Sequence, residues 1–154
     1  MKILILGLIL TSMNSFGHGD HHIPGSIPAA PHGGVVKEAV HQHAGSAKHD
    51  HGKANKKEVF YEAVLKNNLL TIYVLELSTH GYQSFLTIKT SDVKIKSMEA
   101  LNPRKKKSYK LAPNTSKSNY TVDFSQIKGR RFIITISALY AGANYVGKVQ
   151  VERK

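Results

Sequence analysis

The chain has 154 residues, of which 41% are hydrophobic, and a formal charge of +12 when its histidines are neutral. This length allows one domain with extensions, and the absence of cysteine excludes disulfides and thiolate metal ligands. The excess of basic residues suits anionic partners such as nucleic acid, phospholipid or lipopolysaccharide.

Residues 1–17 have the pattern of a secretory signal peptide. Lys2 supplies a positive start, residues 3–10 form a short apolar run, and residues 15–17 (SFG) are a small-x-small cleavage site. The apolar run is too short to span a membrane, and the absence of a nearby cysteine excludes a lipoprotein anchor. We therefore predict an exported protein, periplasmic or secreted, with no nucleic-acid partner; the alternative is a buried N-terminal strand or helix.

Residues 18–57 form a histidine-rich segment that we expect to be flexible. The segment holds eight of the nine histidines of the chain, among many glycine, alanine and proline residues. Neutral imidazole is the commonest metal ligand in proteins, and short histidine-rich tracts are typical of metal binding. The histidines that we predict to bind metal are His18, His21, His22, His32, His41, His43, His49 and His51.

Cleavage after Gly17 would place His18 at the new N-terminus. A free amine and the imidazole of the same residue form a chelate that suits Cu(II). Cleavage one residue later would place His21 third from the amine, in a pattern that suits square-planar Cu(II) or Ni(II). The alternative is a disordered tail that holds metal ions loosely.

Two His-x-His pairs, His41/His43 and His49/His51, flank a spacer of alanine, glycine and serine. In an extended strand, residues i and i+2 project to the same face, so each pair can hold an ion between two nitrogens. The spacer allows both pairs to converge on one ion, and four imidazoles suit Zn(II), Cu(II) or Ni(II). The alternative is a solvated polar loop whose histidines have no such role.

From residue 58 to residue 154 the sequence pattern is different: it consists of short stretches in which apolar and polar residues alternate. The even-numbered positions of residues 132–138 are apolar, and residues 59–65 and 69–75 flank an Asn67-Asn68 turn that predicts a β-hairpin. About eight such strands, separated by turn signals, predict an all-β fold: an antiparallel β-sandwich of immunoglobulin-like size. The predicted organisation is therefore a signal peptide (1–17), a histidine-rich segment (18–57) and a sandwich (58–154).

Two stretches, residues 31–36 (PHGGVV) and 61–74 (YEAVLKNNLLTIYV), carry a resemblance to a known family. They resemble a module of bacterial heavy-metal efflux systems, found in periplasmic adaptor (membrane-fusion) subunits and in small exported proteins. The module has a His-Gly-Gly motif followed by a strand that bears a glutamate, and His32 and Glu62 match it. The resemblance implies that these two residues lie together near a metal ion; the alternative for Glu62 is a solvent-facing position on its strand.

We therefore expect a periplasmic protein that captures or buffers a divalent ion (Cu, Zn, Ni or Co) and exchanges it with an efflux-pump component. No catalytic motif is found, so an enzyme is not expected. The alternative is an exported scaffold or adhesion module with incidental histidines, which contacts anionic surfaces, such as a membrane, through the basic residues 104–107 and 128–131. His80, outside the histidine-rich segment, is expected at the surface.

Overall fold

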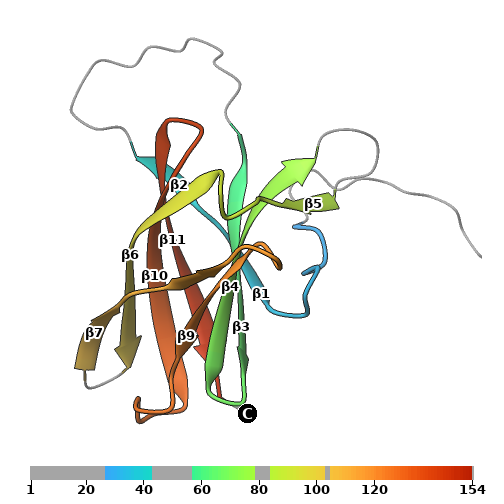
Figure 1. The fold of residues 1–154 in the computed structure, drawn as a ribbon. Coiled ribbons are helices and arrows are strands. Elements are labelled where there is room, and N and C mark those ends of the chain that lie inside the picture. The colour runs from blue at the N-terminus through green and yellow to red at the C-terminus, as the bar shows by residue number, and fades with distance from the viewer. Residues whose placement is uncertain (1–26, 43–56, 79–83, 103–104, 154) are drawn as a thin grey trace, which may run out of the picture.

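The computed structural model describes residues 27–42, 57–78, 84–102 and 105–153. These residues form eleven β-strands in two antiparallel sheets (Figure 1), which confirms the predicted β-sandwich. The described residues include no helix that is long and apolar enough to cross a membrane. The predicted signal peptide, residues 1–17, lies outside the described part of the chain.

The first sheet, sheet A, has the strand order β1-β3-β4-β9-β8, and β5 also pairs with β4. Its strands are β1 (Val35–Glu38), β3 (Val59–Lys66), β4 (Leu69–Ser78), β5 (Ser84–Thr87), β8 (Ala112–Asn114) and β9 (Asn119–Asp123). The second sheet, sheet B, has the order β2-β11-β10-β6-β7. Its strands are β2 (Val40–Gln42), β6 (Val93–Asn102), β7 (Lys105–Tyr109), β10 (Arg131–Tyr140) and β11 (Ala143–Glu152).

The β3–β4 hairpin forms where the sequence predicts it. Asn67 and Asn68 have φ angles of 50° and 63°, which asparagine tolerates better than most residues, and the adjacent residues Lys66 and Leu69 are partners in the ladder. The alternation predicted for β10 is also confirmed, because the side chains of Phe132, Ile134, Ile136 and Ala138 are all buried.

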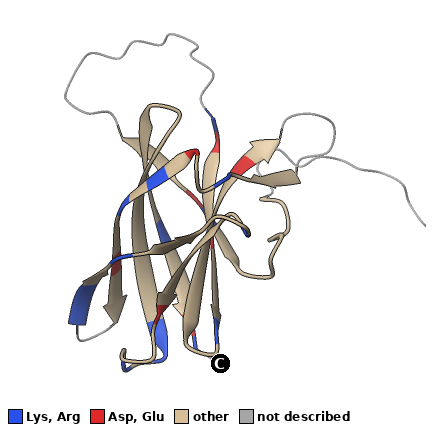
Figure 2. Ribbon diagram, in the orientation of Figure 1, with Lys and Arg blue, Asp and Glu red and all other residues tan. Residues whose placement is uncertain are grey.

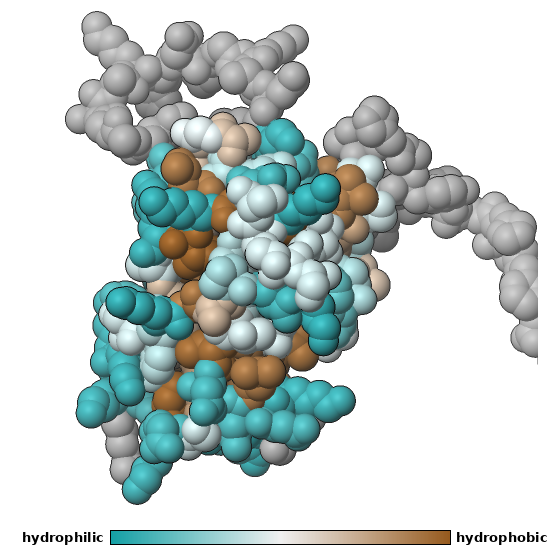
Figure 3. Space-filling view, in the orientation of Figure 1, coloured by the Kyte–Doolittle hydropathy of each residue, from teal (hydrophilic) through white to brown (hydrophobic). Residues whose placement is uncertain are grey.

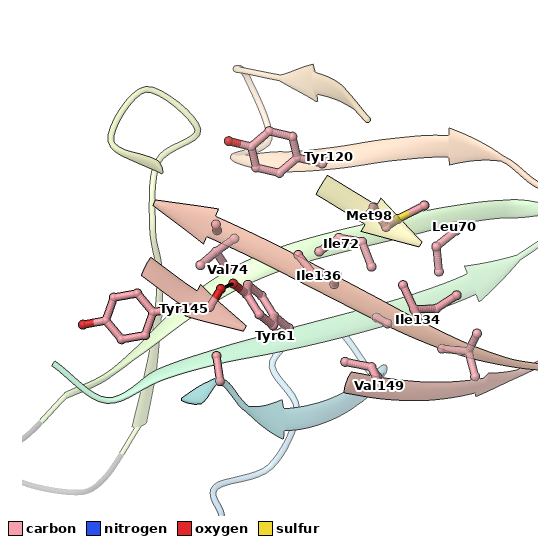
Figure 4. Close-up of a cluster of buried hydrophobic side chains, with 14 of the residues drawn as sticks. Tyr61, Leu70, Ile72, Val74, Met98, Tyr120, Ile134, Ile136, Tyr145 and Val149 are labelled. Atoms are coloured by element: carbon pink, nitrogen blue, oxygen red, sulfur yellow. Dashed lines mark hydrogen bonds between the residues drawn. The ribbon is translucent and has the colours of Figure 1, made fainter. Parts of the chain in front are cut away.

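The hydrophobic core lies between the two sheets, and its side chains come from alternate positions of the strands (Figure 4). Tyr61 of β3 is fully buried there, and its hydroxyl donates a hydrogen bond of 3.0 Å to the carbonyl oxygen of Tyr145. Gly147 of β11 lies against the same ring, where an added Cβ would be 2.7 Å from a ring carbon of Tyr61. The tyrosine ring thus occupies space that a larger residue on β11 would need.

Alkaline pH is expected to destabilise this fold through Tyr61. Burial raises the pKa of the Tyr61 hydroxyl above its ordinary value of 10.0, so the folded chain holds that proton more tightly than the unfolded chain. The resulting stabilisation is complete below pH 10.0 and is lost as the pH rises further. Denaturant titrations should show the unfolding free energy falling above that pH, and Tyr61→Phe should flatten the fall. An equally steep fall in the variant would contradict the assignment.

The N-terminal strands cross from one sheet to the other. β1 pairs with β3 in sheet A and β2 pairs with β11 in sheet B. Between them Ala39 is buried, and its N–H donates to the carbonyl oxygen of Val59 at 2.8 Å. Residues 35–42 therefore belong to the sandwich, so the boundary predicted at residue 58 lies too late. Each of these strands is too short for a clear alternation in the sequence.

Candidate functional site

The His-Gly-Gly motif, residues 32–34, contacts the outer face of sheet A. The chain turns at Gly33, which has a φ of +74°, and then enters β1. Glu62 of β3 and Tyr73 of β4 are partners in the hairpin ladder. They therefore lie side by side on one face of the sheet, opposite the face on which Tyr61 and Ile72 fill the core.

The carboxylate of Glu62 is the centre of this site. The residue has no exposed surface, which overturns the solvent-facing alternative. Its Oε1 atom accepts hydrogen bonds from the backbone N–H groups of His32 and Gly34, at 2.9 and 2.8 Å. Its Oε2 atom lies 2.7 Å from Nδ1 of the His32 ring. Three hydrogen bonds thus satisfy a buried carboxylate, as burial of a charged group requires.

The imidazole ring of His32 is held in one orientation. It stacks on the ring of Tyr73 with a centroid distance of 3.6 Å and an interplanar angle of 1°, and its side chain is 31% exposed. An ionised carboxylate can only accept hydrogen bonds, so Nδ1 must carry the proton that it donates to Glu62. In the neutral ring, the lone pair is then on Nε2.

Each glycine of the motif has its own structural reason. Gly33 adopts a positive φ, which glycine reaches without steric cost. Gly34 approaches β3 so closely that an added Cβ would be 2.6 Å from the carbonyl oxygen of Ala63 and 2.8 Å from a side-chain carbon of Val64. Gly33 thus permits the turn, and Gly34 permits the close approach of the motif to β3.

Gly34→Ala is expected to lift the motif away from β3, because the new methyl group would collide with the backbone of Ala63. Overpacking of this kind costs about 1–3 kcal/mol. Chemical denaturation and hydrogen exchange at the amides of His32 and Gly34 would measure the loss. Gly142→Ala is the control for backbone strain without collision, since Gly142, unlike Gly34, has a positive φ and has open space around it. Equal exchange at these two amides in both variants would contradict the expectation.

His41, the second described histidine, lies at the end of the sandwich where residues 43–56 begin. It is opposite Tyr145 in the β2–β11 ladder, with their rings 5.5 Å apart. The hydroxyl of Tyr145 donates to the carbonyl oxygen of Lys57 at 3.4 Å. Both residues that flank this stretch, Gln42 and Lys57, are therefore placed by one end of β11, where Asn144 donates to Gln42.

Lys57, Glu76 and Tyr140 form a polar cluster that the sequence analysis missed. Lys57 Nζ lies 3.0 Å from Glu76 Oε2 and 3.1 Å from the Tyr140 hydroxyl, which donates to the same carboxylate oxygen. The hydrogen bonds with Tyr140 and Glu76 raise the pKa of Lys57. These residues are up to 83 positions apart in the sequence, so no local pattern connects them.

The remaining predicted ligands, and His80, lie outside the described residues. They are His18, His21, His22, His43, His49 and His51. Within the described ranges, no three side chains of the metal-ligating types come together. Comparison of the chain with family models, with curated proteins and with solved structures gave no match.

Proposed function

We propose that the protein is exported and binds a divalent ion (Cu, Zn, Ni or Co) through neutral imidazoles, with His32 as the ligand that the fold holds in place. The observation that carries this proposal is the bond between His32 Nδ1 and Glu62. Histidines that ligate metals almost always donate their other ring N–H to a carboxylate, a carbonyl or a water molecule. The pair thus favours metal binding through His32 Nε2.

In this proposal Glu62 orients the ligand rather than binding the ion. Both of its oxygens already accept hydrogen bonds, Oε1 from two backbone N–H groups and Oε2 from the imidazole. The stacking on Tyr73 adds a second restraint on the ring. Glu62 was a candidate ligand on the resemblance alone, and its hydrogen bonds favour the supporting role.

The other ligands come from the histidine-rich segment, since His32 supplies only one nitrogen. The two His-x-His pairs between residues 41 and 51 remain the best candidates. His41 begins the first pair from a strand of the sandwich, so one member has a fixed position. We infer from the resemblance that an efflux-pump component exchanges the ion with this protein.

Calorimetric titration of the exported protein with Cu(II), Zn(II), Ni(II) and Co(II) tests the proposal. Changing His41, His43, His49 and His51 to alanine should abolish stoichiometric binding, and His32→Ala should weaken it about ten-fold or more. Protons compete with the metal ion for the imidazole nitrogens, so the ion should be released at about pH 5. His80→Ala is the control and should bind normally. Weak, multi-site binding by every form, or retention of the ion in acid, would refute histidine ligation.

A second function, contact with an anionic membrane, has its own observation. Leu101 and Ile133 are partners in the β6–β10 ladder, point away from the core and are 44% and 41% exposed. They line a shallow hollow of about 220 Å³ together with Arg131. The three lysines 105–107 belong to β7, the neighbouring strand, where they pair with residues 100–102 of β6 (Figure 2). Apolar side chains surrounded by cations suit an interface with anionic lipid.

Sedimentation with lipid vesicles tests this second function. The protein should bind vesicles that contain phosphatidylglycerol more strongly than vesicles of phosphatidylcholine, and Leu101→Ser with Ile133→Ser should reduce that binding. Val40→Ser is the control, because Val40 is also exposed in sheet B but lies in β2, distant from β6 in the strand order. If vesicle binding depends on lipid charge but is equal in the unchanged protein and in all the variants, the contact is nonspecific electrostatic attraction and the apolar residues have no part in it.

A further inference from the structure

A groove of about 520 Å³ opens between the two sheets, on the side of the sandwich that carries β6 and β8. Its floor includes the buried side chains of Val93, Met98 and Tyr120. Figure 3 shows hydrophobic surface between hydrophilic side chains on the side of the molecule where β6 and β7 lie. The groove is apart from the His32–Glu62 site, and none of that site's residues line it.

One wall of the groove is a strand edge. β6 pairs with β10 over most of its length, but β7 pairs only with its second half, from Met98 to Asn102. After Tyr109 the chain leaves sheet B and enters β8 of sheet A. Among the described strands, no strand therefore pairs with the β7 side of residues 93–97. Such an edge can accept the backbone of an added strand.

Two features limit the length of this edge. The Tyr120 hydroxyl donates a hydrogen bond of 2.7 Å to the carbonyl oxygen of Val93, which links the two sheets at one end of the groove. A β-bulge leaves Lys96 without a partner on β10, because Ala138 is opposite Ile95 and Ser137 is opposite Ser97. A bulge bends its strand. An added strand would thus make only a few backbone hydrogen bonds and would bind weakly without other contacts.

The positively charged side chains that line the groove can supply such additional contacts. Lys94, Lys96 and Lys110 all line the groove and are exposed, and among the described residues no lining residue is acidic. Lysines on an edge strand discourage pairing with a second copy of the same chain, since like charges repel. The same lysines attract carboxylates. This pattern of charge favours an acidic strand over a second copy of this chain at the edge.

We propose that this groove binds an extended, acidic segment of a partner protein, which adds as a strand to the edge at residues 93–97. Alternate side chains of an added strand point to opposite faces. Apolar residues of the segment would contact Met98 and Tyr120, and its carboxylates would pair with the lysines. An acyl chain would fill the apolar floor equally well but would leave the strand edge without hydrogen-bond partners, so the free edge favours a peptide.

Two blocked synthetic peptides, Val-Glu-Val-Glu-Val-Glu-Val and Val-Lys-Val-Lys-Val-Lys-Val, are suitable probes for the purified protein. NMR titration should show shifts at the amides of residues 93–97 with the acidic peptide only. The variant Lys94→Glu/Lys96→Glu/Lys110→Glu should weaken binding about ten-fold or more, because the paired charges become repulsive. The control is Lys105→Glu/Lys106→Glu/Lys107→Glu, which makes the same change in net charge outside the edge. It should bind with little change.

An N-methylated form of the acidic peptide separates strand addition from ionic attraction. It keeps the carboxylates but lacks alternate backbone N–H groups, so its binding should be lost. If the methylated peptide binds as well as the acidic peptide, or if both lysine variants lose peptide binding equally, the proposal is overturned. Nonspecific ionic attraction would then explain the binding. Absence of peptide binding would overturn it as well. Binding of sodium laurate in place of the peptide would identify the groove as an amphiphile site instead.

Discussion

Glu62→Ala is expected to lower the free energy of unfolding by about 3 kcal/mol, because a charged acceptor of three hydrogen bonds is removed from a buried position. The loss is limited because residues 32–34 can detach and bind water. Denaturant titration would measure it, and rapid hydrogen exchange at Gly34 would show the detachment. Glu99→Ala is a control, since Glu99 is a partly exposed glutamate in an ion pair with Lys106; exposed pairs contribute about 0–1 kcal/mol.

Glu62→Gln separates the structural role of this residue from its proposed effect on metal binding. The amide oxygen of glutamine can still accept from both backbone N–H groups, so stability should fall by only about 1 kcal/mol. The amide nitrogen, however, would donate to His32 Nδ1, which moves the imidazole proton to Nε2. We therefore expect metal binding to weaken as much as in His32→Ala.

Nitrogen-15 NMR of the imidazole would identify the tautomer directly in the Glu62→Gln variant. A shift of the proton to Nε2 together with unchanged metal affinity would show that His32 does not bind the ion. An unchanged tautomer would instead show that another group, rather than Glu62, fixes the proton. Both outcomes would remove the main support for the proposed function while leaving the fold as described.

Phe132→Ala should give the larger loss of stability, about 3–5 kcal/mol, because a buried aromatic ring leaves a cavity that the sheets fill only in part. The Phe132 ring packs edge-on against Phe124 at 5.4 Å, and the guanidinium of Arg153 lies 5.4 Å from its centroid. Ile133→Ala is the neighbouring control, and truncation of that 41%-exposed side chain should cost well under half as much. Similar losses at both positions, measured by denaturant titration, would contradict the register of β10.

The sequence predicts the parts of the fold in which local pattern and tertiary structure agree. The alternation of β10 and the Asn67-Asn68 turn both determine which face of a strand is buried. The N-terminal strands are different, because β1 and β2 are four and three residues long and are stabilised by pairing with β3 and β11. Strands of that length form through distant partners, which periodicity within a few residues does not reveal.

The site was only partly predictable for a related reason. His32 and Glu62 were paired through a resemblance, whereas the burial of Glu62 depends on residues 32–34 folding over the outer face of the sheet. Tyr73 was overlooked although the hairpin register contains the information. Counting outward from the turn places it directly opposite Glu62. The polar cluster of Lys57, Glu76 and Tyr140 has no such signal, because it joins three separate strands or strand ends.

The crossing of the N-terminal strands between the sheets also determines when the molecule can fold. β2 lies at the edge of sheet B and pairs with β11. Val40 can therefore pair only after Val146, near the other end of the chain, is present. Pairings between such distant residues make folding slow compared with helical proteins of similar size. A chain that is still being synthesised therefore lacks β11, the strand that pairs with both β2 and β10, so sheet B is completed only when the last residues have been made.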